Sequence, residues 1–193
     1  MAERLKGKRI AIVATDGVER VELVEPRKAL EESGATTELI SLEPGTIQTV
    51  NHDEPADTQK VDRTIKDADP GRYDALLIPG GVANPDRLRM DEHVVGFVRE
   101  MRAAGKPIAA ICHGPWVLVE ADLVADRTVT SWPSLQTDIR NAGGEWVDRE
   151  VVVDDGIVTS RKPDDIPAFD ERMIEEFAEG TRTRRPQEAR VVR

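Results

Sequence analysis

The chain has 193 residues and a net charge of -10, with 37 Asp and Glu against 27 Lys and Arg. This length suits one domain with a full core, and no apolar run is long enough to cross a bilayer. The acidic balance argues against nucleic-acid binding, which needs a basic surface, and the single cysteine excludes an internal disulfide.

Strand-like and helix-like patterns alternate along the first half of the chain. A helix with an apolar face is expected over 21–30, ended by Gly34, and another over 91–104, stopped by Gly105. The polar stretch 51–70 contains little that can build a core, so we expect a hairpin followed by an excursion. The predicted strands are 8–14, 36–42, 46–50, 75–78 and 108–111.

The second half of the chain ends in a hairpin and a helix. Residues 151–160 alternate around Asp155-Gly156, a dipeptide typical of tight turns, and indicate an antiparallel edge. Residues 164–179 are predicted to form an amphipathic helix. Because strands alternate with helices, we expect a three-layer α/β sandwich with a mostly parallel sheet. In such sheets ligands bind beyond the carboxyl ends of the strands.

The two ends of the chain bear on its organisation and location. No apolar signal segment follows the basic start, and a lone thiol suits a reducing compartment, so we expect a cytoplasmic protein. Residues 1–180 are predicted to form a single domain. Residues 181–193 are basic, interrupted by proline and poor in apolar side chains, which predicts a flexible basic tail.

The most informative segment is 107–115, where a short apolar run ends on Cys112-His113-Gly114-Pro115. A sharp turn from strand to helix exposes the residue at the turn, and the first amides of the helix favour a thiolate. Cys112 is therefore a candidate nucleophile. The alternative is a buried structural cysteine, because free cysteine is among the most buried residue types.

The histidines restrict the chemistry that this cysteine can perform. The chain has three, His52, His93 and His113, and none follows position 113. This excludes the order of α/β-hydrolases and glutamine amidotransferases, in which the base lies many residues after the nucleophile. His113 is then the best-placed base, and the other two are interpreted as solvated surface residues. The chain shows neither metal-ligand spacing nor a phosphate-binding glycine motif, so we expect no metal and no cofactor.

Three further positions are candidates on weaker patterns. Gly80-Gly81 ends a strand without side chains, which allows an amide to approach an oxyanion, although an ordinary β-turn explains it as well. Asp86 is either a third member that orients His113 or a helix N-cap. Glu22 is either a hydrogen-bond partner of the thiolate or part of a solvated helix face, together with the glutamates three residues before and after it.

Five segments, spread in order over residues 8–179, together identify a protein family far more specifically than any one of them alone. They are Asp16-Gly-Val-Glu-Arg-Val-Glu22-Leu, Ile78-Pro-Gly-Gly81, Ala110-Ile-Cys112-His113-Gly-Pro115, Thr130-Ser-Trp-Pro133 and Asn141-Ala-Gly-Gly-Glu-Trp-Val-Asp148. With these segments the chain resembles the PfpI family of the DJ/PfpI superfamily.

The resemblance implies a flavodoxin-like, class I glutamine amidotransferase-like sandwich with Cys112 as nucleophile in a strained backbone conformation. It implies that Glu22 hydrogen-bonds the sulfur and that the amides of Gly81 and His113 form the oxyanion site. In peptidase-like members, an acidic residue after the Gly-Gly turn reaches the histidine across a subunit interface. Asp86 is the match here and implies a homodimer or higher homo-oligomer. It is shorter than the family's Glu and follows an extra residue, which argues against peptidase activity.

Family members are described as intracellular peptidases, as cofactor-free glyoxalases that convert methylglyoxal to lactate, and as deglycases. All begin with a thiolate adding to an electrophilic carbon, so the resemblance predicts the first step better than the substrate. Trp132, at an aromatic position of the family, is expected either to wall the pocket or to belong to the core.

The leading hypothesis is a cytoplasmic, stress-protective cysteine hydrolase that acts on small carbonyl compounds or on glycated proteins and peptides. We expect neither a nucleic-acid nor a membrane partner. One alternative is a redox-sensing or chaperone-like stress protein without turnover, because a reactive thiol oxidises readily. The other is an intracellular cysteine peptidase.

Overall fold

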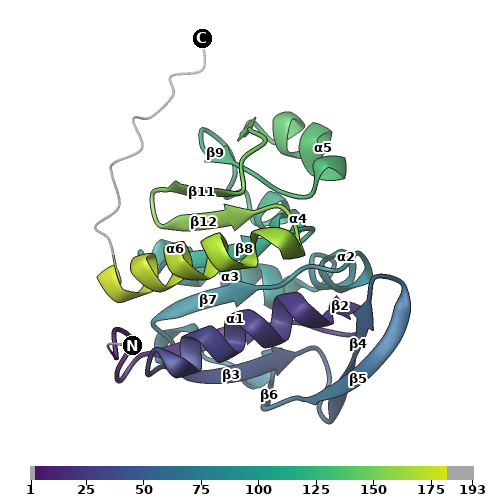
Figure 1. Cartoon of the computed structure of the whole chain (residues 1–193), viewed down its shortest axis with the longest axis vertical. Coiled ribbons are helices and arrows are strands. Elements are labelled where there is room, and N and C mark those ends of the chain that lie inside the picture. Colours follow the sequence, from purple (N-terminus) through teal and green to yellow (C-terminus); the bar gives the residue numbers. More distant parts are fainter. Residues whose placement is uncertain (1–2, 182–193) are drawn as a thin grey trace.

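A seven-stranded sheet forms the middle layer of the computed structural model, which describes residues 3–181 (Figure 1). The strand order is β11-β12-β8-β7-β1-β3-β6, and every neighbouring pair is parallel except β11 with β12. The strands are β1 (Arg9–Val13), β3 (Thr36–Ser41), β6 (Arg63–Thr64), β7 (Ala75–Ile78), β8 (Ile108–Ile111), β11 (Val151–Asp154) and β12 (Ile157–Ser160). The predicted α/β sandwich with a mostly parallel sheet is confirmed.

Helices cover both faces of this sheet, as Figure 1 shows, with α1 and α6 in front and α3 behind. Side chains of β1 alternate between the two cores: Ile10 and Ile12 pack in the cluster under α1 and α6, whereas Ala11 and Val13 pack in the cluster under α3. A strand buried on both faces reads as a continuous apolar run, which is why the sequence predicted it. The helices are α1 (Arg20–Glu32), α2 (Ala83–Leu88), α3 (Glu92–Ala103), α4 (Pro115–Glu120), α5 (Gln136–Asn141) and α6 (Ile166–Glu179).

Two small sheets flank the main one. The first joins β2 (Val18–Glu19), β4 (Thr46–Asn51) and β5 (Glu54–Lys60), and the second joins β9 (Thr128–Val129) and β10 (Glu145–Trp146). The expected strand at 46–50 therefore exists, but it pairs with β2 and β5 outside the main sheet. Most residues of β5 are exposed, in agreement with the lack of core-forming residues after position 51.

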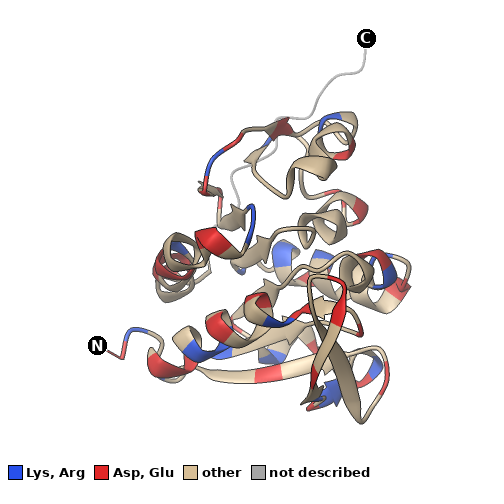
Figure 2. Cartoon of the chain, turned by 45° about the vertical axis from the view of Figure 1, so that its right-hand side comes forward, with Lys and Arg blue, Asp and Glu red and all other residues tan. Residues whose placement is uncertain are grey.

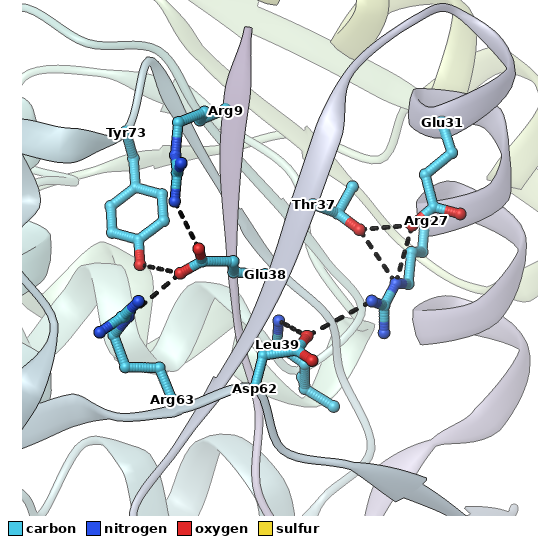
Figure 3. A network of polar contacts seen from close by, with 9 residues as sticks. All are labelled: Arg9, Arg27, Glu31, Thr37, Glu38, Leu39, Asp62, Arg63 and Tyr73. Atoms are coloured by element: carbon cyan, nitrogen blue, oxygen red, sulfur yellow. Dashed lines mark hydrogen bonds and ion pairs between the residues drawn. The ribbon is translucent and has the colours of Figure 1, made fainter.

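Two polar clusters occupy the edge of the sheet near β3 (Figure 3). On one face, Glu38 accepts hydrogen bonds from the Tyr73 hydroxyl and from Arg63 Nε at 3.1 Å, and it also contacts Arg9. On the other face, the Thr37 hydroxyl hydrogen-bonds with the side chains that α1 places there. Successive residues of a strand point to opposite faces, so each face of this edge has its own cluster.

The last elements differ slightly from the prediction. The helix expected over 164–179 begins at Ile166, because Pro163–Asp165 forms a single 3₁₀ turn before it. Of the predicted basic tail, residues 182–193 lie outside the described residues, so that tail stays a prediction. Within residues 3–181 we find no helix with the length and apolar character needed to span a membrane.

Candidate active site

Cys112 directly follows β8, at the carboxyl end of the central strands. Its backbone has φ of 61°, in the left-handed region that a residue with a side chain adopts at a cost of about 1–3 kcal/mol. The strand holds it in place, because the Cys112 amide donates to the Ser160 carbonyl of β12 at 3.0 Å. The conformation agrees with the strained backbone that the family resemblance implies.

The Cys112 side chain lines a cavity of about 250 Å³. Although it is only 7% exposed, it opens on this cavity and is not enclosed by hydrocarbon, which argues against a purely structural role. Gly81 follows β7 at the same edge of the sheet, as parallel strands require. The residues that line the cavity are Glu19, Glu22, His52, Asp53, Gly81, Val82, Cys112, His113, Trp132 and Pro163.

Glu22 lies in the first turn of α1, completely buried beside the thiol. Its Oε2 accepts a hydrogen bond from the Gly80 amide at 2.9 Å, and the carboxyl group also hydrogen-bonds with Cys112. Burial raises the pKa of Glu22 from 4.5 to about 8, against the lowering effect of these two hydrogen bonds. Glu22 is therefore mostly protonated at neutral pH. The alternative of a solvated glutamate face is wrong, because Glu22 is buried.

The ionisation of Cys112 is controlled by opposing contacts. Burial raises the pKa of the thiol most, and the charge and hydrogen bond of Glu22 raise it further, whereas the amides of His113 and Gly81 lower it. The expectation that the start of a helix favours the thiolate is thus too simple, since α4 has six residues and desolvation dominates. Protonation of Glu22 removes its charge, so Glu22 and Cys112 together carry at most one negative charge.

The His113 ring lies against the sulfur and between two indoles. Its Nδ1 is 3.2 Å from Cys112 Sγ, and its Nε2 is 3.4 Å from the hydroxyl of Ser134. The ring stacks on Trp132 with centroids 5.8 Å apart and meets Trp116 at 5.3 Å. Burial lowers the pKa of His113 to about 4, so the imidazole is neutral at pH 7 and can accept a proton.

The Gly80-Gly81 turn is packed too closely for any side chain. A Cβ on Gly80 would lie 2.5 Å from Glu22 Oε2 and 2.7 Å from Cys112 Cβ. Gly81 has φ of 82°, and a Cβ there would lie 2.2 Å from the carbonyl oxygen of Gly17. An ordinary β-turn would not require such close contacts. The two glycines bring a backbone amide and a carboxyl group up to the sulfur.

Asn84 fixes this turn, and sequence reasoning did not identify it. The side chain is completely buried; its oxygen accepts from the Thr15 amide at 2.7 Å, and its nitrogen donates to the carbonyls of Pro79 and Gly80 at 2.9 and 3.0 Å. It thereby ties the loop after β1 to the glycine turn after β7. No sequence signal separates it from an ordinary residue at a helix start.

The structure brings together six of the seven predicted site residues and leaves Asp86 apart. The Asp86 side chain is 51% exposed, forms an ion pair with Arg89 at 3.2 Å and does not line the cavity. The N-cap alternative is wrong, because α2 begins at Ala83 and is capped by Val82. Trp132 is 39% exposed and walls the cavity, so the core alternative does not apply.

Two exposed-loop residues join the site from the hairpin between β4 and β5. His52 and Asp53 line the cavity, although the sequence indicated only a solvated histidine there. Both are exposed, so the expected exposure of His52 is correct, but its place beside the cavity is new. Residues 3–181 contain no group of three or more His, Cys, Asp or Glu that could hold a metal ion.

Comparison with known proteins gives consistent matches. The model of the DJ-1/PfpI family matches residues 8–176. The chain is 40% identical over 168 residues to protein/nucleic acid deglycase 2 of Escherichia coli, covering 86% of this chain and 96% of that protein. It is 43% identical over 169 residues to general stress protein 18 of Bacillus subtilis, covering 87% and 96%. It is 42% identical over 161 residues to deglycase PfpI of Pyrococcus furiosus, covering 83% and 94%.

A solved structure shares the fold. The crystal structure of a ThiJ/PfpI domain protein from Brachyspira murdochii superposes with a TM-score of 0.82, at 22% sequence identity. The match covers 90% of this chain and 98% of that one. At this identity the likeness bears on the architecture alone.

Proposed function

Because the chain belongs to the DJ-1/PfpI family, we propose that it is a cytoplasmic cysteine hydrolase of the deglycase and glyoxalase type. Its substrates are reactive carbonyl compounds and their adducts on amines, and Cys112 is the nucleophile. The observation that carries this proposal is the contact of one strained cysteine, in an open cavity, with a protonated glutamate and a neutral histidine.

The first step begins at the sulfur. The thiol proton passes to Nδ1 of His113, 3.2 Å away, and Sγ forms a bond to the aldehyde carbon of a dicarbonyl. The π electrons of that carbonyl move to its oxygen, which accepts hydrogen bonds from the amides of Gly81 and His113 and then takes the proton. With an amine adduct, sulfur displaces nitrogen from the carbinol carbon, and His113 returns the proton to the leaving amine.

Both routes give the same hemithioacetal on Cys112. The hydrogen on its carbinol carbon moves to the neighbouring ketone carbon through an enediol, which leaves a thioester that water cleaves. One molecule of dicarbonyl and one of water thus give one hydroxy acid. The aldehyde carbon is oxidised and the ketone carbon is reduced, so the reaction needs no external oxidant or reductant.

The test compares wild type with Cys112→Ser on two substrates. Lactate formed from methylglyoxal and free amine released from a purified glycated peptide are quantified by mass spectrometry, in a buffer without primary amines. We expect Cys112→Ser to lose at least about a hundredfold in kcat/KM on both. Equal rates for the two proteins would contradict the proposal.

The alternatives receive less support. A redox sensor needs a thiolate that persists without a substrate, and burial raises the pKa of Cys112, whereas the hydrolase forms the thiolate only as the proton passes to His113. A Cys112 that mild peroxide converts to the sulfinate, in a protein without turnover, would favour the sensor instead. A peptidase of the expected type needs an acidic partner that reaches His113 from a neighbouring subunit, and the aspartate at position 86 is shorter than the glutamate of the family.

An oligomer is part of the proposal, since Asp86 can serve His113 only from a neighbouring subunit. The surface around α2 supports it: Met90 is 82% exposed and Val82 is 55% exposed, so an exposed apolar residue lies before and after Asp86 in the chain. Light scattering at micromolar concentration tests this point. A monomer would remove Asp86 from the site.

A further inference from the structure

We infer that the cavity selects substrates that carry an ammonium or guanidinium group within a few bonds of the carbon attacked by Cys112. This inference rests on the proposed function and names its substrate class. Two acidic side chains, Glu19 and Asp53, line the cavity beside the protonated Glu22, and among residues 3–181 no Lys or Arg lines it.

Glu19 is a built part of the wall. It sits at the N-cap position of α1, is only 9% exposed, and accepts a hydrogen bond from the His52 amide at 2.9 Å. That bond joins the Glu19 side chain, at the start of α1, to the tip of the β4–β5 hairpin. Figure 2 shows acidic residues, drawn in red, at the tip of this hairpin. The carboxylate of Glu19 is therefore held at the cavity and forms no ion pair with any residue between 3 and 181.

The two basic residues that directly neighbour cavity residues in the chain each pair with a carboxylate that does not line the cavity. Arg20, which follows Glu19 in the chain, pairs with Asp57 at 3.0 Å. Lys162, which precedes the cavity residue Pro163, pairs with Asp164 at 3.1 Å. The negative charge of the cavity wall is consequently left for a ligand to balance.

Glu22 lies at the base of the cavity and adds no charge to it. The side chain is completely buried, and burial keeps its carboxyl group mostly protonated at neutral pH. The charge that favours a cationic nitrogen is therefore that of Glu19 and Asp53, because hydrogen bonds between ionised partners are stronger than neutral ones.

The size of the cavity agrees with this class of substrate. A volume of about 250 Å³ is slightly below the usual range of small-molecule sites, so it accommodates one modified side chain and not a folded surface. A cleft lined by one sign of charge raises the local concentration of the opposite charge about 10- to 1000-fold. The field does not raise the local concentration of neutral carbonyl compounds.

The charge selection can be measured without turnover, because Cys112 is the single cysteine of the chain. Its rate of modification is followed with a cationic trimethylammonium-ethyl methanethiosulfonate and an anionic sulfonatoethyl methanethiosulfonate. The ratio of the two rates is divided by the ratio for the urea-unfolded chain. We expect the folded protein to favour the cationic reagent by at least about tenfold, and less so as salt is added.

Variants assign that preference to the cavity. Glu19→Gln and Asp53→Asn are each expected to lower the ratio at least about threefold. Asp53 is exposed, so its substitution leaves the core intact. Glu54→Gln is the matched control, because it removes the same charge from the neighbouring hairpin residue, which does not line the cavity, and should leave the ratio unchanged. A ratio equal to that of the unfolded chain, or one indifferent to Glu19→Gln and Asp53→Asn, would overturn the inference.

A second measurement separates this inference from the proposed function. The value of kcat/KM is compared for an α-oxoaldehyde that carries a trimethylammonium group within a few bonds of its carbonyl carbons and for the neutral analogue with a tert-butyl group in that place. We expect the cationic compound to be preferred about tenfold, and Asp53→Asn to reduce the preference. Equal turnover of both compounds would overturn charge selection and leave the hydrolase intact. Reagent selectivity without any turnover would contradict the hydrolase and support charge selection.

Discussion

Glu22 and Glu38 are both glutamates shielded from solvent, but the protein gives them opposite surroundings. Glu38, at the sheet edge, faces Arg9, Arg63 and the Tyr73 hydroxyl, which together hold its pKa below the usual value although burial raises it (Figure 3). Glu22, in the cavity, faces a thiol and a backbone amide, and burial raises its pKa to about 8. The partners, and not the residue type, decide which carboxyl group carries a charge at neutral pH.

The contrast separates a structural cluster from a reactive one. Arginines and a hydroxyl around Glu38 compensate its desolvation and make it part of the scaffold. The cavity leaves Glu22 without a cation, so the proton it retains remains available beside Cys112. Active sites commonly carry such uncompensated groups at a cost in stability.

The largest expected effect on stability comes from adding one methyl group to Gly80, between Glu22 and Cys112. Gly80→Ala should lower the free energy of unfolding by about 3 kcal/mol or more, because the new Cβ overlaps Glu22 and Cys112. We expect kcat/KM to fall at least tenfold as well. Gly96→Ala in α3 is the control: its Cβ meets nothing within 4 Å, so it should stabilise by about 0.5–1 kcal/mol. Urea unfolding measures the free energy of unfolding of both variants. Equal changes in the two would contradict the close packing of Gly80 against Glu22 and Cys112.

Glu22→Gln should stabilise the fold while impairing the chemistry. The folded-state pKa of about 8 lies above the ordinary 4.5, so the folded state holds the proton more tightly and wild-type stability falls as pH rises from about 4.5 to 8. Glutamine keeps an acceptor for the Gly80 amide and does not ionise. We expect a gain of about 3 kcal/mol at pH 9, little gain at pH 4, and at least a tenfold loss in kcat/KM. A destabilised variant at pH 9 would refute this.

Asp170 on α6 is a second uncompensated carboxyl group and should follow the same rule more weakly. Burial and the charge of Glu25 raise its pKa to about 7, and its Oδ1 has no partner among the described residues. Because this value exceeds the ordinary 3.8, wild-type stability should fall between about pH 4 and pH 7. Asp170→Asn should therefore gain about 2 kcal/mol at pH 8 and almost nothing at pH 4. Thermal unfolding at the two pH values decides, and a gain that does not change with pH would count against it.

Glu38→Gln is expected to have the smallest effect and the opposite sign. Its lowered pKa means that the charged form stabilises the fold above the ordinary value of 4.5 and that this contribution is lost as pH falls. The variant should lose about 1 kcal/mol at pH 7, because the arginines around it are partly solvated, and this loss should shrink as the pH falls below 4.5. Activity should not change. A Glu38→Gln variant that is more stable than wild type at pH 7 would contradict the claim that the charged form of Glu38, unlike that of Glu22, stabilises the fold.

The family, the sheet and the position of the candidate nucleophile could be predicted from the sequence. Apolar runs such as 75–78 and 108–111, when a glycine turn follows them, are best interpreted as buried strands. The position of Cys112 at the end of the second run predicted the sharp turn from strand to helix that the structure contains. The family resemblance then assigned Glu22 and Gly81 to the same edge.

The environment of each side chain could not be predicted in the same way. The solvated-face alternative for Glu22 was plausible because its helix also exposes Glu25, and burial depends on what the β7 turn brings against it. Two-residue strands such as β2 are too short to show a period, so the separate sheet that carries His52 and Asp53 was missed. Asn84 shows its role only through partners 4 to 69 residues away.

The most direct test of this account is the protonation of Glu22 in the folded protein. Side-chain-labelled glutamate carboxyl carbons are followed by ¹³C NMR across the pH range, and the Glu22 resonance is assigned by its loss in Glu22→Gln. Cys112→Ser repeats the titration without the thiol. We predict a carboxyl group that titrates near pH 8, far above its ordinary 4.5. A midpoint near 4.5 would mean that a charged Glu22 faces the sulfur at neutral pH, and the charge assignment of the cavity would be wrong.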